Sequence, residues 1–268
     1  MLLRWLRDRR RRRLLLKPFP PAWEDRLAEQ FAYWRRLPED DRSRLRDLLR
    51  IFINERHWEA CGGITLTDEM KILIAAQACL LILNLDAESY RHVRTILVYP
   101  TGYIAPTERR SGSLISESEQ AVLGQAQYRG PVILSWQHVL EGSINGQDGH
   151  NLVYHEFAHK LDMADGLVDG TPILHDRALF DDWVRVMARE YESLVGQVEG
   201  RHPMMQPSLL RPYGALNPAE FFAVATEVFF EQPRRLRDAH SELYDVLRRY
   251  FKQDPAALFE RDQRTSAV

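Results

Sequence analysis

The chain has 268 residues, of which 45% are apolar and 28% are charged, and its formal net charge at pH 7 is −2. This balance excludes an intrinsically disordered chain, and the length allows a hydrophobic core that needs no disulfide bonds. Only two cysteines occur, Cys61 and Cys79, which excludes a disulfide framework and a cysteine-based metal site and favours a reducing compartment.

The near-neutral charge hides an asymmetry between the start of the chain and the rest. Residues 1–17 hold eight basic side chains against Asp8 alone, a net charge of +7, so the remainder carries 28 basic and 37 acidic groups, a net charge of −9. We expect residues 1–20 to form a flexible basic arm on an acidic body. Such an arm could touch an anionic membrane surface or nucleic acid, but a solvated terminus is the simpler interpretation.

Neither export nor membrane insertion is predicted. After the arginines only Leu14–Leu16 are apolar, which is too few for the core of a signal peptide. The longest apolar stretch, Ile72–Leu85, is interrupted by Gln77 and is too short to span a bilayer. We therefore expect a cytoplasmic protein without a transmembrane segment.

The first half of the chain is predicted to be helical. Periodic apolar residues indicate helices at about 23–37 and 38–55. Thr67, followed by two acidic residues, is a typical helix start, and that helix is predicted to run to Leu83.

The middle of the chain changes character. Val93–Tyr99 and Pro131–Trp136 are short β-branched runs typical of strands, and Pro106–Gln127 between them is polar and loop-rich, with room for one weak strand. Helices are predicted again at about 150–164, 176–197, 217–230 and 239–251. This order is typical of an α+β fold that is mostly helical with a small mixed sheet. We expect one domain over residues 21–255 and a flexible tail over residues 256–268.

His155, Glu156 and His159 form the pattern His-Glu-x-x-His. Two histidines four residues apart lie on one face of a helix, so their imidazoles could bind one Zn²⁺, and Glu156 at the edge of that face could accept a proton from the attacking water. Two surface histidines on a solvated helix are the plainer alternative. The surrounding residues are apolar, namely Leu152, Val153, Phe157 and Leu161. They indicate a buried helix, where two unpartnered histidines would be costly, and so favour a metal site.

A catalytic zinc site needs a third protein ligand and one open position. The downstream candidates are His175, Asp176, His202, Glu220, Glu227 and His240. Glu220 lies in the first turn of a helix started by Asn217 and Pro218, but Asn217 and Glu220 also match a capping box, in which the glutamate only bonds backbone. Both interpretations stay open, and Glu227, two turns further along the same face, is a rival ligand. Asp162 could orient a ligand imidazole or serve only as a surface or capping residue.

Two segments, HEFAHKLD at 155–162 and NPAEFFA at 217–223, resemble the Mlc titration factor A family of bacterial zinc peptidases. The likeness covers residues 20 to 255 and includes 130–136 and 149–154. The Tyr-Gly pair at 213–214 and the second segment also resemble the catalytic domain of anthrax lethal factor, a more distant gluzincin. The resemblance implies a zincin-like metallopeptidase domain that holds one Zn²⁺, with Glu220 as the third ligand and Tyr213 as a group that stabilises the transition state.

The resemblance further implies an aminopeptidase-like activity on peptide substrates and binding to Mlc, a transcriptional repressor of sugar uptake. A mainly non-catalytic regulator that sequesters such a repressor is the alternative. Direct nucleic-acid binding is not expected, because the arm offers no recognisable reading helix and the body is acidic. In the peptidase interpretation, the strand at 131–136 is either an edge that pairs with an extended substrate or an ordinary core strand.

Overall fold

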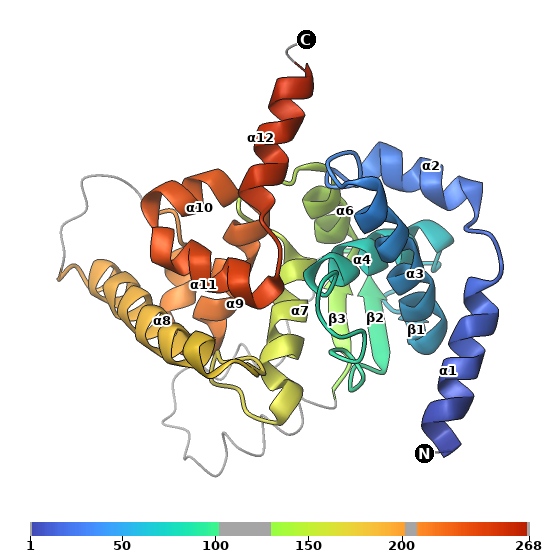
Figure 1. Cartoon of the computed structure of the whole chain (residues 1–268), viewed down its shortest axis with the longest axis horizontal. Helices are drawn as coiled ribbons and strands as arrows, with labels where there is room; N and C mark the ends of the chain where they lie inside the picture. Colours follow the sequence, from blue (N-terminus) through green and yellow to red (C-terminus); the bar gives the residue numbers. More distant parts are fainter. Residues whose placement is uncertain (1, 102–129, 202–207, 267–268) are drawn as a thin grey trace.

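The computed structural model describes residues 2–101, 130–201 and 208–266. Helices make up most of the fold and surround a three-stranded sheet (Figure 1). The helix with the His-Glu-x-x-His motif, α7 (Leu152–Asp162), lies between this sheet and the C-terminal helices. The predicted α+β class with mostly helical content is confirmed.

Four helices form the N-terminal part: α1 (Leu2–Leu15), α2 (Pro21–Gln30), α3 (Glu39–Glu55) and α4 (Asp68–Leu81). Thr67 starts α4 as predicted, because its hydroxyl accepts a hydrogen bond from the N–H of Met70 (3.3 Å). The helix predicted at 23–37 is shorter than expected. It ends at Gln30, and Phe31 is already extended.

The basic N-terminal segment is helical in the structure, where the sequence predicts a flexible arm. The Arg11 guanidinium donates two hydrogen bonds of 2.6 Å to Glu55 on α3 and one of 2.5 Å to Glu88. Arg50 of α3 donates to the backbone carbonyls of Leu15 (3.4 Å) and Lys17 at the end of α1. These partners come from distant parts of the chain, so no pattern within residues 1–17 could indicate them.

The sheet contains β1 (His57–Ala60), β2 (Thr95–Tyr99) and β3 (Val132–Ser135) in that spatial order. Both predicted strands are present, and β1 was not predicted. The mixed sheet expected from the sequence is wholly parallel in the part of the chain that the structure describes. The physical reason is the crossover connection: α4 carries the chain from β1 back to the same end of the sheet. The segment 106–127 lies outside the described residues.

The C-terminal part is helical. It consists of α6 (Trp136–Ile144), α7, the 3₁₀ turn η2 (Met163–Asp165), α8 (Arg177–Val198), the 3₁₀ turn η3 (Pro212–Ala215), α9 (Pro218–Glu231), α10 (Pro233–Ala239), α11 (Ser241–Phe251) and α12 (Pro255–Ser266). Four of these match the predicted helices within a few residues. The tail expected at 256–268 is helical to Ser266.

Helix α9 is central to the core. Every residue from Phe221 to Glu231 on it is buried, as expected for a helix that other elements surround on all sides. Phe222, Phe229 and Phe230 have no exposed surface, and burial of each such ring contributes about 1.5–3 kcal/mol to folding. Helix α9 packs directly on α7, and this contact brings the two halves of the candidate site together.

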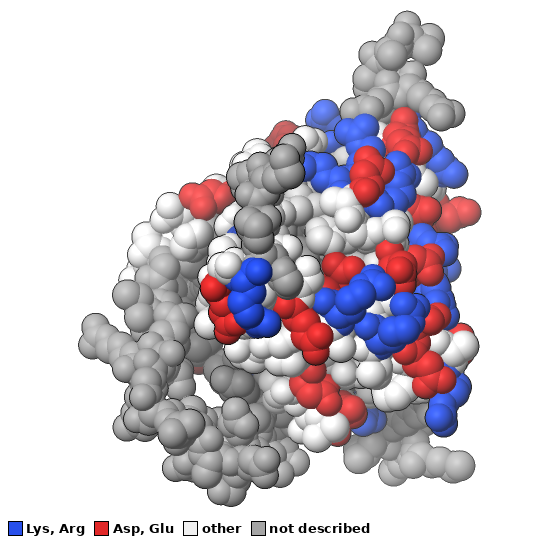
Figure 2. Space-filling view, turned by 90° about the vertical axis from the view of Figure 1, so that its left-hand side faces the viewer, with Lys and Arg blue, Asp and Glu red and all other residues white. Residues whose placement is uncertain are grey.

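Charges on the side of the molecule formed by α8, α10 and α11 are of both signs and closely interspersed (Figure 2). Arg185 and Arg189 on α8 both pair with Glu242 on α11, at 2.8 and 3.1 Å. Across the described ranges, the structure contains no helix with the length and apolar character needed to cross a bilayer.

Candidate metal centre

Helix α7 presents His155 and His159 one turn apart. It begins at Asn151, whose side-chain oxygen accepts a hydrogen bond from the N–H of Tyr154 (3.0 Å). It ends in the turn η2, and Gly166 follows with φ +98°, close to the predicted helix end at about residue 164. Phe157 and other apolar residues fill the opposite side of the helix and are buried in the core. The two imidazoles therefore project from a helix whose position is fixed by its caps and by its packing in the core.

Helix α9 brings Glu220 to the same place. The side chain of Asn217 caps the helix by accepting from the N–H of Glu220 (3.0 Å), while the carboxylate of Glu220 turns toward α7. Gly170 lies against the start of α9: its φ is +79°, and a Cβ added there would lie 2.4 Å from the carbonyl oxygen of Pro218. Only glycine tolerates both constraints. The close approach fixes the position of the first turn of α9.

Three donor atoms converge on one point. Nε2 of His155 lies 3.1 Å from Oε2 of Glu220, Nε2 of His159 lies 3.3 Å from the same oxygen, and the two Nε2 atoms are 3.2 Å apart. These residues form the group with metal-binding geometry found among the residues described. Ligand atoms about 2.0–2.1 Å from a tetrahedral zinc ion lie about 3.3–3.4 Å from one another. Two imidazoles and one carboxylate at this spacing fit three corners of such a site.

The electrostatics of the cluster also favour a cation. Although burial opposes it, the hydrogen bonds from His155 to Glu220 and Glu227 raise the pKa of His155 to about 10. Burial likewise opposes the shift at Glu220, but hydrogen bonds from both histidines lower the pKa of that carboxyl to about 2. The carboxylates of Glu220 and Glu227 therefore stabilise a positive charge at His155, and they would stabilise a metal ion beside it in the same way.

Glu227, the rival third ligand, has a different role in the structure. It accepts from Nδ1–H of His155 (2.8 Å), on the imidazole edge that faces away from Glu220. Its carboxylate also accepts from the N–H of Asn151 (2.7 Å) and from the guanidinium of Arg211. A carboxylate on the outer nitrogen fixes the orientation of a histidine ligand and raises its basicity. Glu227 thus orients the imidazole of His155, a role that was one of the two alternatives for Asp162 in the sequence.

Asp162 makes no hydrogen bond to His159 in the described structure, so its expected orienting contact is absent. It is fully buried, and burial raises its pKa to about 6. A deeper polar network supports α7 instead. The side-chain amide of Asn151 donates to Gln77 (2.9 Å) and Glu231 (3.0 Å), and burial raises the pKa of Glu231 to about 9.

The remaining described candidates for the third metal ligand do not belong to the converging group. Asp176 caps α8, because its carboxylate accepts from the N–H groups of Ala178 and Leu179, and His240 pairs with Glu190 at 2.8 Å. His175 is exposed and lies outside the converging group, and His202 lies outside the described residues. Sequence patterns could have indicated Asn151 as a helix cap, but no pattern indicated Arg211.

Glu156 and Tyr213 both lie beside the three donors. Glu156 follows His155 directly on α7, is partly exposed, and makes no hydrogen bond or ion pair with another described residue. Tyr213 belongs to η3, and its ring centroid lies 5.8 Å from that of His155. Its side chain is 43% exposed, so one side of it faces solvent beside the cluster.

Comparison with known proteins identifies the family. A family model described as Glucose-regulated metallo-peptidase M90 matches residues 5–252. The chain belongs to this metallopeptidase family. An uncharacterized protein of Synechocystis sp. is 38% identical over 253 residues, which cover 94% of this chain and 90% of that protein. Two proteins named Mlc titration factor A are similar too. The one from Serratia proteamaculans is 30% identical over 248 residues, which cover 92% of each chain. The one from Pectobacterium atrosepticum is 29% identical over 228 residues, which cover 82% of each chain.

The match to the M90 family confirms the resemblance drawn from the two motif segments. Since the match begins at residue 5, it also includes most of α1, whereas the resemblance seen in the motif segments began at about residue 20. A metal ion is the cofactor that a metallopeptidase family implies, and His155, His159 and Glu220 are the described residues that fit one.

Proposed function

We propose that this protein is a zinc-dependent peptidase that hydrolyses peptide bonds, with one Zn²⁺ per chain held by His155, His159 and Glu220. The observation that carries the proposal is the convergence of their three donor atoms at 3.1–3.3 Å. Two neutral imidazoles and one carboxylate suit zinc, and a site with three protein ligands leaves one position for the reaction. Aminopeptidase-like specificity is proposed from the family resemblance alone.

Bound zinc would act as a Lewis acid that polarises the scissile carbonyl and makes water acidic enough to lose a proton near neutral pH. Glu156 accepts the proton of the attacking water and passes it to the leaving amine. Its carboxylate suits this task because it lies at the edge of the cluster and is bound to no other described residue. Tyr213 donates a hydrogen bond to the oxyanion that develops on the former carbonyl oxygen, a contact worth about 3 kcal/mol in comparable sites.

Strand β3 offers an edge with which an extended peptide substrate could pair. β3 pairs only with β2 among the described strands, and it contacts α7. A substrate paired with the other edge of β3 would present its backbone next to the motif helix. Cys61 and Cys79 are not joined by a disulfide bond, which is compatible with the proposal that the enzyme acts in the cytoplasm.

Metal removal tests the proposal directly. The purified chain is expected to contain about one zinc ion per molecule, and dialysis against a chelator should abolish peptide hydrolysis, with recovery on addition of zinc. Metal analysis and a fluorogenic peptide assay on the same samples measure both quantities. A protein that contains no divalent metal and hydrolyses peptides equally well after chelation would contradict the proposal.

A second candidate function rests on the names of two relatives, which are called Mlc titration factor A. We propose that this chain also binds a repressor of the Mlc type, either beside its catalysis or as its main task. If binding is the main task, the variant Glu156→Gln should retain a purified Mlc-type repressor in a pull-down with undiminished affinity. Failure of the wild-type chain to retain that repressor would contradict this second function.

A further inference from the structure

Helix α1 has an inner face that attaches it to the protein. Arg7 and Arg11 point to the body and pair with acidic groups there, Arg7 with Glu88 at 2.9 Å and Arg11 with Glu55 and Glu88. The hydrogen bonds that Arg11 donates to Glu55 raise the pKa of Arg11 further, although burial opposes the rise. Five further exposed cations of this segment form no ion pair with another described residue, and Asp8 is the acidic residue of α1 itself.

The outer face of α1 carries four of these cations, and Lys17 lies just past the end of the helix. They are exposed and have no acidic partner within the described ranges: Arg9, Arg10, Arg12, Arg13 and Lys17. This differs from the α8 and α11 side of the molecule, where acidic residues accompany the arginines (Figure 2). A single-sign face of this kind, on a body whose net charge is −9, attracts anionic partners specifically to α1.

Apolar side chains are interleaved with these cations. Trp5 is 50% exposed, Leu6 47% and Leu16 84%. The guanidinium of Arg9 lies over the Trp5 ring, 5.4 Å from its centroid. Tryptophan beside arginine is the combination that settles at the boundary between lipid headgroups and acyl chains. A phosphate backbone would use the cations but would leave these three apolar groups in water.

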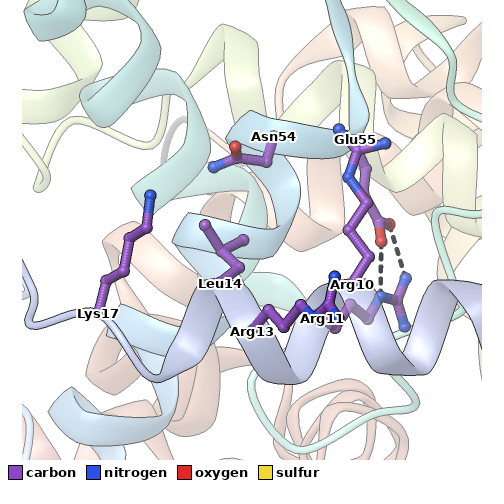
Figure 3. A pocket seen from close by; sticks show the side chains of 7 residues that line it. All are labelled: Arg10, Arg11, Arg13, Leu14, Lys17, Asn54 and Glu55. Atoms are coloured by element: carbon purple, nitrogen blue, oxygen red, sulfur yellow. Dashed lines mark hydrogen bonds and ion pairs between the residues drawn. The ribbon is translucent and has the colours of Figure 1, made fainter.

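A groove between α1 and α3 adds a place for a phosphate group. It has a volume of about 210 Å³ and is lined on the α1 side mainly by Arg10, Arg13 and Lys17, and on the α3 side by Asn54 and Glu55 (Figure 3). Arg11 in the same groove is occupied by Glu55, whereas the other three cations make no such pair. Helix α1, which forms one side of the groove, lies at the outer edge of the molecule (Figure 1).

We propose that the outer face of α1 docks this protein onto an anionic phospholipid membrane. The arginines and Lys17 contact headgroup phosphates, Trp5 and Leu6 enter the interface, and the acidic body is held away from the surface because α1 lies at the edge of the molecule. Docking requires neither the metal cluster nor catalysis.

Co-sedimentation of the full chain with vesicles tests the proposal. The wild type should bind vesicles of equal parts phosphatidylglycerol and phosphatidylcholine, should not bind pure phosphatidylcholine, and should be released by high salt. The double variant Arg9→Glu/Arg13→Glu should lose at least about tenfold in partition onto the anionic vesicles. Neither side chain forms an ion pair with the body in the described part of the chain, so the thermal midpoint of unfolding should change little.

The matched control changes the net charge of the protein by the same amount, but at positions far from α1. The double variant Arg177→Glu/Arg248→Glu reverses two arginines on α8 and α11 and should keep full vesicle binding. Absence of binding by the wild type, or an equal loss in both double variants, would overturn the proposal. Tighter binding of the wild type to duplex DNA than to the anionic vesicles at the same salt, lost in the α1 variant, would overturn it in favour of nucleic acid.

Discussion

Replacing Glu156 by Gln is expected to lower peptide hydrolysis by about three orders of magnitude while leaving the zinc content unchanged. The amide has nearly the same shape as the carboxylate but cannot accept a proton, so only the proton transfer is lost. Because Glu156 is not among the three converging donors, its replacement leaves the metal centre intact. Hydrolysis of a fluorogenic peptide and metal analysis of the same preparation measure the two effects separately.

The variant Glu192→Gln is a suitable control for Glu156→Gln, since it makes the same change on an exposed part of α8 and should keep full activity. Full activity in Glu156→Gln itself would remove this carboxylate from the chemistry and leave the regulatory function as the better explanation of the fold. Loss of zinc together with activity would show that the residue supports the metal rather than the proton transfer.

The residues that converge at the candidate site can be proposed from the sequence, whereas the contacts around them cannot. His155 and His159 could be paired by the helical period alone, since residues four apart share a face. Glu220 could not be placed in that way, because it lies on a separate helix and also matches a capping box. The structure separates the two roles: the Asn217 side chain provides the cap, and the carboxylate of Glu220 is left for the histidines.

Contacts between distant segments account for what the sequence left undetermined. The role of Glu227 depends on which edge of the His155 imidazole faces α9, which only the packing of α7 against α9 decides. The anchoring of α1 depends on Glu55 and Glu88, which lie far away in the chain. Similarly, β1 spans only four residues, and its pattern of exposure does not alternate. Its strand conformation comes from pairing with β2 rather than from its own residues.

Replacing Glu220 by Ala is expected to weaken zinc binding on the order of a thousandfold, because one of three protein ligands is removed. The cap of α9 should survive, since Asn217 accepts from the backbone N–H of residue 220, which alanine keeps. The metal-free variant should keep its fold but unfold at a lower temperature than the metal-free wild type, because the contacts of the Glu220 carboxylate with His155 and His159 are lost. Added zinc should raise the unfolding temperature of the wild type only, because a ligand stabilises the state that binds it.

The comparison with Glu227→Gln decides between the two glutamates on α9. Removing the carboxylate from the outer nitrogen of His155 is expected to weaken zinc binding by only about 10–100-fold, since Nε2 of that imidazole stays available. Titration of each metal-free variant with zinc, followed by a competing chelator, ranks the two effects. A larger loss in Glu227→Gln than in Glu220→Ala would make Glu227 the third ligand. Unchanged zinc affinity in Glu220→Ala would reduce Glu220 to a residue of the first turn of α9.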